Sequence, residues 1–210
     1  EYSIVKFSDE EGNLKYVDSQ HFWADGVKCK YCGVNKKLYQ RNKGLESYAY
    51  SFIHEDKPEE LFNMKFDVII GNPPYQMSDG SGKGAGATPL YDKFVEAAIR
   101  MKPTYLSMII PSRWFSGGRG LDSFRKKMLK DKSFVEIHDY EDASECFPGV
   151  EIKGGVNYFL WSKNHSEKCK FINYKNNKKI SESIRELNQF EFLIRYNEAI
   201  PILEKIISSN

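Results

Sequence analysis

The sequence predicts an α/β fold built on a mainly parallel β-sheet, and two patterns lead to that prediction. Apolar runs of strand length occur at residues 66–71, 105–110, 134–138 and 156–161. Amphipathic segments with helical spacing lie between the first three runs, at residues 90–101 and 121–129. Strands that alternate with helices favour a parallel sheet with crossover helices. In such sheets, ligands bind beyond the carboxyl ends of the strands.

The composition is that of a globular protein and does not by itself select a partner. The 210 residues are 40% hydrophobic and 29% charged, with 31 Lys and Arg against 29 Asp and Glu. A net charge of +2 neither requires nor excludes nucleic acid, because a basic face can occur on a neutral protein. No run approaches the ~20 apolar residues of a membrane span. With no secretory signal and only four cysteines, we expect a reducing cytoplasm and no membrane partner.

Residues 1–45 are expected to form an N-terminal insertion or appendage. Short β-like runs at residues 2–7 and 14–17 flank a Glu-Glu-Gly-Asn turn and predict a hairpin. Cys29 and Cys32 then have the spacing of a zinc knuckle, and His21 and His54 are available to complete four ligands. Because there is no second Cys-x-x-Cys, two free thiols are the favoured interpretation and no metal is assigned.

Residues 46–170 carry the α/β pattern. We expect a strand at residues 49–54, a short helix or turn at 57–63, and the apolar strand 66–71 before a double proline. Residues 76–88 hold four glycines and predict a mobile loop. The helix at 90–101 should end at Pro103, and the strand at 105–110 at Pro111.

Basic residues gather around the helix expected at residues 121–129. They are either a solvated helix face or a contact surface for a sugar-phosphate backbone. The set comprises Arg113, Arg119, Arg125, Lys126, Lys127 and Lys130. Residues 171–210 become polar at 173–179 and then helical around 192–207, so a linker or the start of a target-recognition or C-terminal region is expected there.

The most informative quartet is Asn72-Pro73-Pro74-Tyr75, directly after an apolar strand. The amino group of adenine is a poor nucleophile because its lone pair is delocalised, so methylating it requires acceptors for both amino hydrogens. The Asn72 oxygen offers one acceptor, and a carbonyl of the proline pair, held by a fixed φ, offers the other. Tyr75 offers an aromatic face to a base lifted out of a duplex. The alternative is a simple turn, although chance gives such a quartet in only about one chain in a hundred.

The run from Phe66 to Tyr75 resembles motif IV of the amino-methyltransferases. Residues 46–161 resemble the catalytic domain of gamma-class DNA adenine-N6 methyltransferases of type II restriction–modification systems. This resemblance implies a partial, Rossmann-like AdoMet-dependent methyltransferase core, mainly parallel with an antiparallel edge strand. It implies S-adenosyl-L-methionine (AdoMet) as cofactor and double-stranded DNA as substrate in a prokaryotic cytoplasm. A restriction nuclease domain or subunit is a further partner in some of these systems.

The resemblance also assigns residues to the cofactor. Asp56 matches the acidic residue that hydrogen-bonds the adenine of AdoMet, with His54 and Glu55 as alternatives for that position. Phe94 matches the motif V phenylalanine that packs on this adenine, and Asn72 borders the cofactor as well. The alternative for Phe94 is core packing, and Asp56 would alternatively cap the turn that follows it.

Other residues are assigned to the DNA. Phe147 lies in a segment similar to motif VIII and would stack on the extruded base opposite Tyr75, with core packing as its alternative. Residues 108–114 look like motif VI, which lines the pocket. Arg113, Arg119 and Lys126 are assigned to the DNA backbone. Lys83 joins them because its Gly-rich loop is expected to be a flexible flap beside the target-base pocket. The loop does not fit a nucleotide phosphate loop, because Gly rather than Ser or Thr follows the lysine.

One departure from the family pattern is the absence of a Gly-rich motif I from residues 1–65. We expect it upstream of residue 1 in a longer protein, so this chain alone should bind AdoMet poorly. Two other functions stay open. The same quartet serves glutamine-amide methylation, with related quartets in cytosine-N4 and RNA methylation, and an inactive DNA-binding fragment is the second alternative. The Gly-rich loop and the motif VIII likeness favour DNA adenine.

Overall fold

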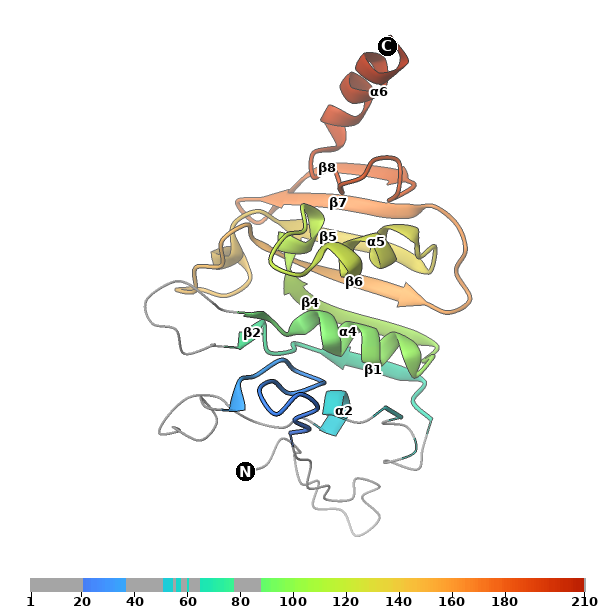
Figure 1. Ribbon diagram of the computed structural model, residues 1–210. Coiled ribbons are helices and arrows are strands. Elements are labelled where there is room, and N and C mark those ends of the chain that lie inside the picture. The colour runs from blue at the N-terminus through green and yellow to red at the C-terminus, as the bar shows by residue number, and fades with distance from the viewer. Residues whose placement is uncertain are drawn as a thin grey trace. The chain divides into compact units, whose positions relative to one another are not determined.

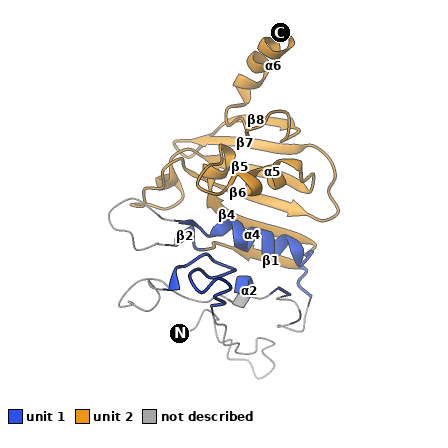
Figure 2. Ribbon diagram, in the orientation of Figure 1, with its two compact units in different colours: residues 1–67, 74–103 blue, residues 68–73, 104–210 orange. Residues whose placement is uncertain are grey.

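The computed structural model describes residues 21–36, 51–54, 56–57, 60, 65–77 and 88–209 (Figure 1). The chain divides into two compact units (Figure 2). Unit 1 comprises residues 1–67 and 74–103, and unit 2 comprises residues 68–73 and 104–210. The expected N-terminal hairpin, Glu55, and the loop with Lys83 lie outside the described residues.

Unit 2 is built on a six-stranded sheet in the order β1-β4-β6-β5-β7-β8. Its strands are β1 Val68–Gly71, β4 Tyr105–Pro111, β5 Phe134–Tyr140, β6 Val156–Ser162, β7 Cys169–Lys175 and β8 Lys178–Arg185. β1 is parallel to β4, and β5 is parallel to β7; β6 is antiparallel to both β4 and β5. Four of these six strands (β1, β4, β5 and β7) therefore point the same way, which confirms the mainly parallel sheet. β8 is the antiparallel edge strand, and the interior β6 is a reversal that the sequence did not indicate.

The core of unit 2 forms where apolar strand positions meet helix α5, Asp122–Lys130. In β4 the alternate residues Leu106, Met108 and Ile110 are buried, as expected for a strand with one face on a core. Figure 1 shows α5 lying over one face of the sheet, in front of β5 and β6. Aromatic side chains fill this layer, with the Phe134 and Phe159 rings 5.2 Å apart and edge to face. The helix predicted at residues 121–129 and the four predicted strands are confirmed to within two residues at their ends.

Two features of residues 171–210 differ from the prediction. β7 and β8 form a hairpin in the main sheet, joined by Asn176 and Asn177, whose positive φ angles of 54° and 56° suit a two-residue turn. Helix α6 begins only at Ile200, so the expected helix from residue 192 is wrong over its first part. Pro201 lies in the first turn of α6, where proline is tolerated because no intrahelical N–H is needed there. That a target-recognition region begins near residue 171 remains a prediction.

Unit 1 contains helices α2, Ser51–His54, and α4, Tyr91–Arg100, with a short ladder of β2, Gln76–Met77, and β3, Thr88–Pro89. α4 confirms the predicted helix. The strand expected at residues 49–54 is wrong over residues 51–54, which are helical. Phe52 and Ile53 pack into one cluster, which neighbouring residues of a strand cannot do because they point to opposite faces. No helix in the described part of the chain has the length and apolar character needed to cross a bilayer.

Candidate functional site

Asn72 lies directly beyond the carboxyl end of β1. Gly71, the last residue of β1, pairs with Met108 of β4, so the chain leaves the sheet at a fixed point. The Asn72 side chain is exposed, whereas Pro73 is buried. The amide is therefore free to meet a ligand while the residue behind it is held by packing. The role of the Asn72 oxygen as an acceptor for an amino group stays a prediction.

The boundary between the two units falls inside the quartet. Asn72 and Pro73 belong to unit 2, and Pro74 and Tyr75 belong to unit 1. Tyr75 is half-buried, and its carbonyl accepts a hydrogen bond of 3.1 Å from the N–H of Leu90. Leu90 directly precedes α4, so this bond fixes Tyr75 beside the start of that helix. The β2–β3 ladder begins at the next residue and reinforces the attachment.

Three segments of unit 2 meet at one edge of the sheet. β1, β4 and β5 point the same way, so Asn72, the 3-10 helix η1 (Ser112–Phe115) and residues 141–155 all follow carboxyl ends. Phe147 lies in the last segment, half-buried, and its N–H donates to the Ala143 carbonyl at 2.9 Å. The segment then returns to β6, where the Gly155 carbonyl accepts from the N–H of Ser112 at 3.0 Å. The predicted residues Asn72, Arg113 and Phe147 therefore share this edge.

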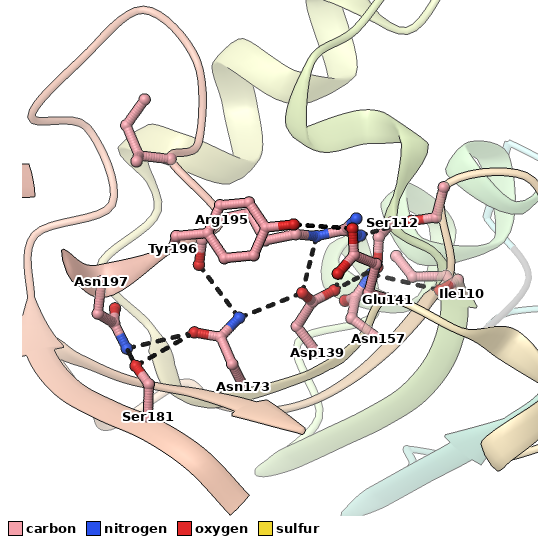
Figure 3. Close-up of polar contacts among 12 residues, drawn as sticks. Ile110, Ser112, Asp139, Glu141, Asn157, Asn173, Ser181, Arg195, Tyr196 and Asn197 are labelled. Carbon is pink, nitrogen blue, oxygen red and sulfur yellow. Dashed lines mark hydrogen bonds and ion pairs between the residues drawn. The ribbon is translucent and has the colours of Figure 1, made fainter. Parts of the chain in front are cut away.

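A buried carboxylate supports the edge from within the sheet (Figure 3). Asp139 of β5 is only 1% exposed and forms an ion pair with Arg195, whose Nε lies 2.8 Å from Oδ2. The Ser112 hydroxyl donates to Oδ1 at 2.8 Å, and the Asn173 amide donates to Oδ2 at 3.3 Å. Burial raises the pKa of Asp139, while the Arg195 guanidinium and the donors Ser112 and Asn173 act in the opposite direction.

The same network joins β6 to the end of β4. The Asn157 amide donates to the Ser112 hydroxyl at 3.2 Å and to the Ile110 carbonyl at 3.3 Å. These bonds hold the first residue of η1 in place, so the network positions the edge and does not itself meet substrate. The sequence analysis missed it. The available signal was a polar residue inside each of three apolar strands, namely Asp139, Asn157 and Asn173.

The motif VI-like segment serves mostly as core. Trp114 is fully buried and packs edge to face on Phe115, with ring centroids 4.8 Å apart. Met108 and Ser112 are buried as well. Arg113 is half-buried, so within η1 it is the charged side chain that reaches toward solvent at the edge.

The basic residues divide into exposed and buried groups. Arg125 is 3% exposed and donates to the Ser116 carbonyl at 2.7 Å and to Asp122 at 2.9 Å, so it holds the loop and is not available to DNA. Arg119 and Lys126 are exposed. Arg119 lies in a loop whose residues 117–120 all have positive φ, which turns the chain sharply between η1 and α5.

The exposed cations lie at different distances from the carboxyl edge of the sheet. α5 leads away from the carboxyl edge toward the start of β5, and its nine residues span about 13 Å. Arg119 precedes the helix and lies on the side of the edge, Lys126 lies midway along it, and Lys130 lies at its far end. Lys130 therefore offers a matched comparison for Arg119 and Lys126.

The residues assigned to AdoMet lie in unit 1, apart from Asn72. Asp56 is exposed, with its carboxylate 3.4 Å from the Lys30 ammonium. The Phe94 ring is half-buried and stacks on Phe52, with centroids 5.9 Å apart and planes inclined by 13°. Part of its surface is therefore used by the core of unit 1. His54 is buried beside His21.

The chain is similar to two curated proteins. It is 42% identical over 188 residues to a Mycoplasma pneumoniae protein described as an "uncharacterized adenine-specific methylase", which covers 83% of this chain and 44% of that protein. It is 27% identical over 128 residues to the type II methyltransferase M.PstI of Providencia stuartii, which covers 57% of this chain and 25% of that protein. The chain thus spans less than half the length of these curated relatives.

Solved structures show a weaker likeness. The methyltransferase subunit of a type I restriction-modification system from Streptococcus thermophilus gives a TM-score of 0.43 at 16% identity, over 77% of this chain and 35% of that one. The family model described as "Eco57I restriction-modification methylase" matches residues 2–147, which is more than half of the chain. The chain therefore belongs to the Eco57I restriction-modification methylase family.

Proposed function

We propose that this chain is the catalytic part of a DNA methyltransferase that transfers a methyl group from AdoMet to the N6 amino group of adenine. The observation that carries the proposal is the exposed Asn72 side chain at the carboxyl end of β1, with buried Pro73 behind it. Family membership and the adenine-specific relative support the same reaction. The activity of the longer protein is part of this proposal, since the chain spans 44% of that relative.

In this mechanism the Asn72 side-chain oxygen and the Pro73 carbonyl accept hydrogen bonds from the two N6 hydrogens. Both acceptors stabilise the positive charge that develops on N6 as its lone pair forms the new bond to carbon. AdoMet, when bound, supplies an electrophilic methyl group on sulfur. Transfer would leave the C–S electron pair on the cofactor sulfur, and N6 would lose one proton to solvent water. Because the amino nitrogen attacks directly, no side chain of the protein becomes covalently attached.

Base flipping places the target adenine within reach of these acceptors. We propose that Tyr75 and Phe147 stack on its two faces, as the resemblance to motifs IV and VIII implies. Tyr75 is anchored by its bond to Leu90, and Phe147 by the turn at Ala143. Arg113, Arg119 and Lys126 would contact phosphates of double-stranded DNA at the same edge, and Lys83 would do so from the Gly-rich loop.

The chain fits AdoMet only in part. Asp56 presents an exposed carboxylate that can accept from the adenine amino group, and Phe94 would pack its ring on the cofactor adenine, as the resemblance to motif V implies. Val68 and Ile70 are 53% and 79% exposed on β1, which pairs only with β4 among the described strands. Apolar side chains on an edge strand favour its being covered by a further segment. We therefore propose that an upstream motif I segment of the longer protein completes the cofactor site. A restriction nuclease domain or subunit in a prokaryotic cytoplasm is the partner that the family favours.

Methyl transfer to unmethylated duplex DNA by the full-length protein tests the function. With radiolabelled AdoMet, Asn72→Ala should lower the transfer rate about 10²- to 10³-fold while leaving DNA affinity within about twofold. Asn164→Ala is the matched control, because Asn164 is an exposed asparagine after β6, at the opposite edge of the sheet. Methylation of a glutamine peptide in place of DNA, or full turnover by Asn72→Ala, would refute the proposal.

A further inference from the structure

Four metal-ligating side chains converge in unit 1. The ligand atoms of His21, Cys29, Cys32 and His54 all lie within 4.8 Å of one another. Cys29, Cys32 and His54 are 3%, 4% and 4% exposed. The first three residues come from the segment 21–36, and His54 is the last residue of α2. The sequence contains only one Cys-x-x-Cys, and the fold supplies the two imidazoles that the motif lacks.

Two of the six distances between ligand atoms match the edges of a zinc tetrahedron. With Zn–S near 2.3 Å and Zn–N near 2.0–2.1 Å, tetrahedral angles place S and N about 3.6 Å apart and two N atoms about 3.3 Å apart. Nδ1 of His21 lies 3.4 Å from Sγ of Cys32 and 3.2 Å from Nε2 of His54. Two of the edges therefore already have the lengths that a bound ion would impose.

The main chain holds the two sulfurs in a tight turn. Gly33 has φ of +76°, and its N–H donates to the Cys29 carbonyl at 2.9 Å. The N–H of Cys29 donates to the Val34 carbonyl at 2.9 Å and closes the hairpin. The main-chain amides of Cys32 and Val34 also bond to the sulfurs of Cys29 and Cys32. Hydrogen bonds from main-chain N–H groups to sulfur orient metal-binding thiolates and offset their negative charge.

The cluster ties together the small core of unit 1. Cys29, Cys32 and Ile53 pack with Leu90 and Ala97, at the start and on the inner face of α4. Apolar contacts between such short segments bury little area, and small cores of this kind commonly rely on a metal or on disulfides. All four cysteines of the chain are free thiols in the structure, so no disulfide performs that role.

We propose that His21, Cys29, Cys32 and His54 bind a structural Zn²⁺ ion that fastens residues 21–36 and α2 against α4. Four protein ligands leave no coordination position for water or substrate, which marks a structural rather than a catalytic site. The site stands independently of methyl transfer. The proposal departs from the sequence-based interpretation of Cys29 and Cys32 as two free thiols.

Metal content of the full-length protein, purified under reducing conditions, tests the proposal. Wild type should carry about one zinc ion per chain, and Cys32→Ala and His54→Gln should each carry less than about a tenth of that. Cys169→Ala and His165→Gln are the matched controls, because they remove a buried cysteine and a histidine in unit 2 and should keep the ion. Zinc retained in both cluster variants, or lost equally in the controls, would overturn the site.

Cobalt substitution covers the case in which the variants fail to fold. Wild type stripped of metal and titrated with Co²⁺ should develop the strong visible bands of tetrahedral cobalt with a thiolate charge-transfer band, and Zn²⁺ should abolish both. A weak octahedral spectrum would indicate surface binding and would overturn the proposal. So would a folded, reduced chain that takes up neither ion, or a Cys29–Cys32 disulfide found by mass spectrometry in the freshly purified protein. Failure of methyl transfer in a chain that holds zinc would refute only the proposed function.

Discussion

Breaking the buried Asp139–Arg195 pair from one side should destabilise unit 2, and Arg195→Met tests this. Two guanidinium nitrogens lie 2.8 and 3.1 Å from the two oxygens of Asp139, which is 1% exposed. The substitution keeps most of the aliphatic length but leaves the carboxylate with neutral donors alone, Ser112 and Asn173. Breaking a buried pair from one side costs about 3–5 kcal/mol, because a buried charge remains uncompensated. We expect a loss of that size at pH 7.5.

The loss should depend on pH with a defined sign. Burial already raises the pKa of Asp139, and removal of Arg195 raises it further. A carboxyl group whose pKa is higher in the folded state binds more protons there than in the unfolded chain. Its stabilising contribution is therefore complete below the unfolded value of about 4 and is lost as pH rises through the folded pKa. The deficit of Arg195→Met relative to wild type should be smaller at pH 5 than at pH 7.5.

Urea unfolding followed by circular dichroism at both pH values measures this deficit. Arg119→Met is the matched control, because it removes an exposed arginine of the same unit and should change stability by less than about 0.5 kcal/mol. The double variant Asp139→Asn/Arg195→Met should lose less than the sum of its two single variants. A loss below about 1 kcal/mol at pH 7.5, or a loss that does not change with pH, would contradict the assigned pair.

Two further predictions concern the carboxyl edge. Gly155→Ala should lower the free energy of unfolding by at least about 3 kcal/mol, because its φ is +78° and a Cβ would lie 2.1 and 2.6 Å from two main-chain carbonyl oxygens. Gly149→Ala is the control, with φ +79° and open space around it. It should lower the free energy of unfolding by only about 1–2 kcal/mol in the same experiment. The double variant Arg119→Ala/Lys126→Ala should weaken duplex binding irrespective of sequence and lower the salt slope by about two in fluorescence anisotropy, whereas Lys130→Ala should leave both nearly unchanged. An unchanged affinity of the double variant at low salt would exclude this surface.

Long apolar or amphipathic segments explain which parts of the fold the sequence predicted. Helix α4 was identifiable because its apolar positions match the helical period over ten residues, and the strand before Asn72 because an apolar run ends at a double proline. α2 was taken for a strand because its four residues are too few to distinguish the two periods. β8 was missed because it is an edge strand with exposed polar positions, so its sequence resembles that of a loop. β7 was missed with it, because the polar stretch 173–179 begins within β7.

The site was predictable where neighbouring residues carry the chemistry and not where folding brings distant residues together. Asn72 and its prolines form one continuous motif with a defined role. Asp139 and Arg195 are 56 residues apart, and His21 and His54 are 33 apart. No local pattern relates the members of either pair, since both depend on strand order or helix packing. Their signals were single polar residues in apolar strands and a Cys-x-x-Cys without a second half.

The two halves of the quartet are held in place by different parts of the structure. Asn72 and Pro73 are held by the sheet of unit 2, whose edge is braced by the Asp139 network. Tyr75 is held in unit 1 through Leu90, which packs in the same core as Cys29 and Cys32. Removing the zinc ion would loosen the support of Tyr75 while leaving that of Asn72 intact. Chelation of the metal should therefore raise the KM for DNA more than it lowers kcat, because KM reports how well the flipped base is held. Weakening the Asp139 network should instead lower kcat.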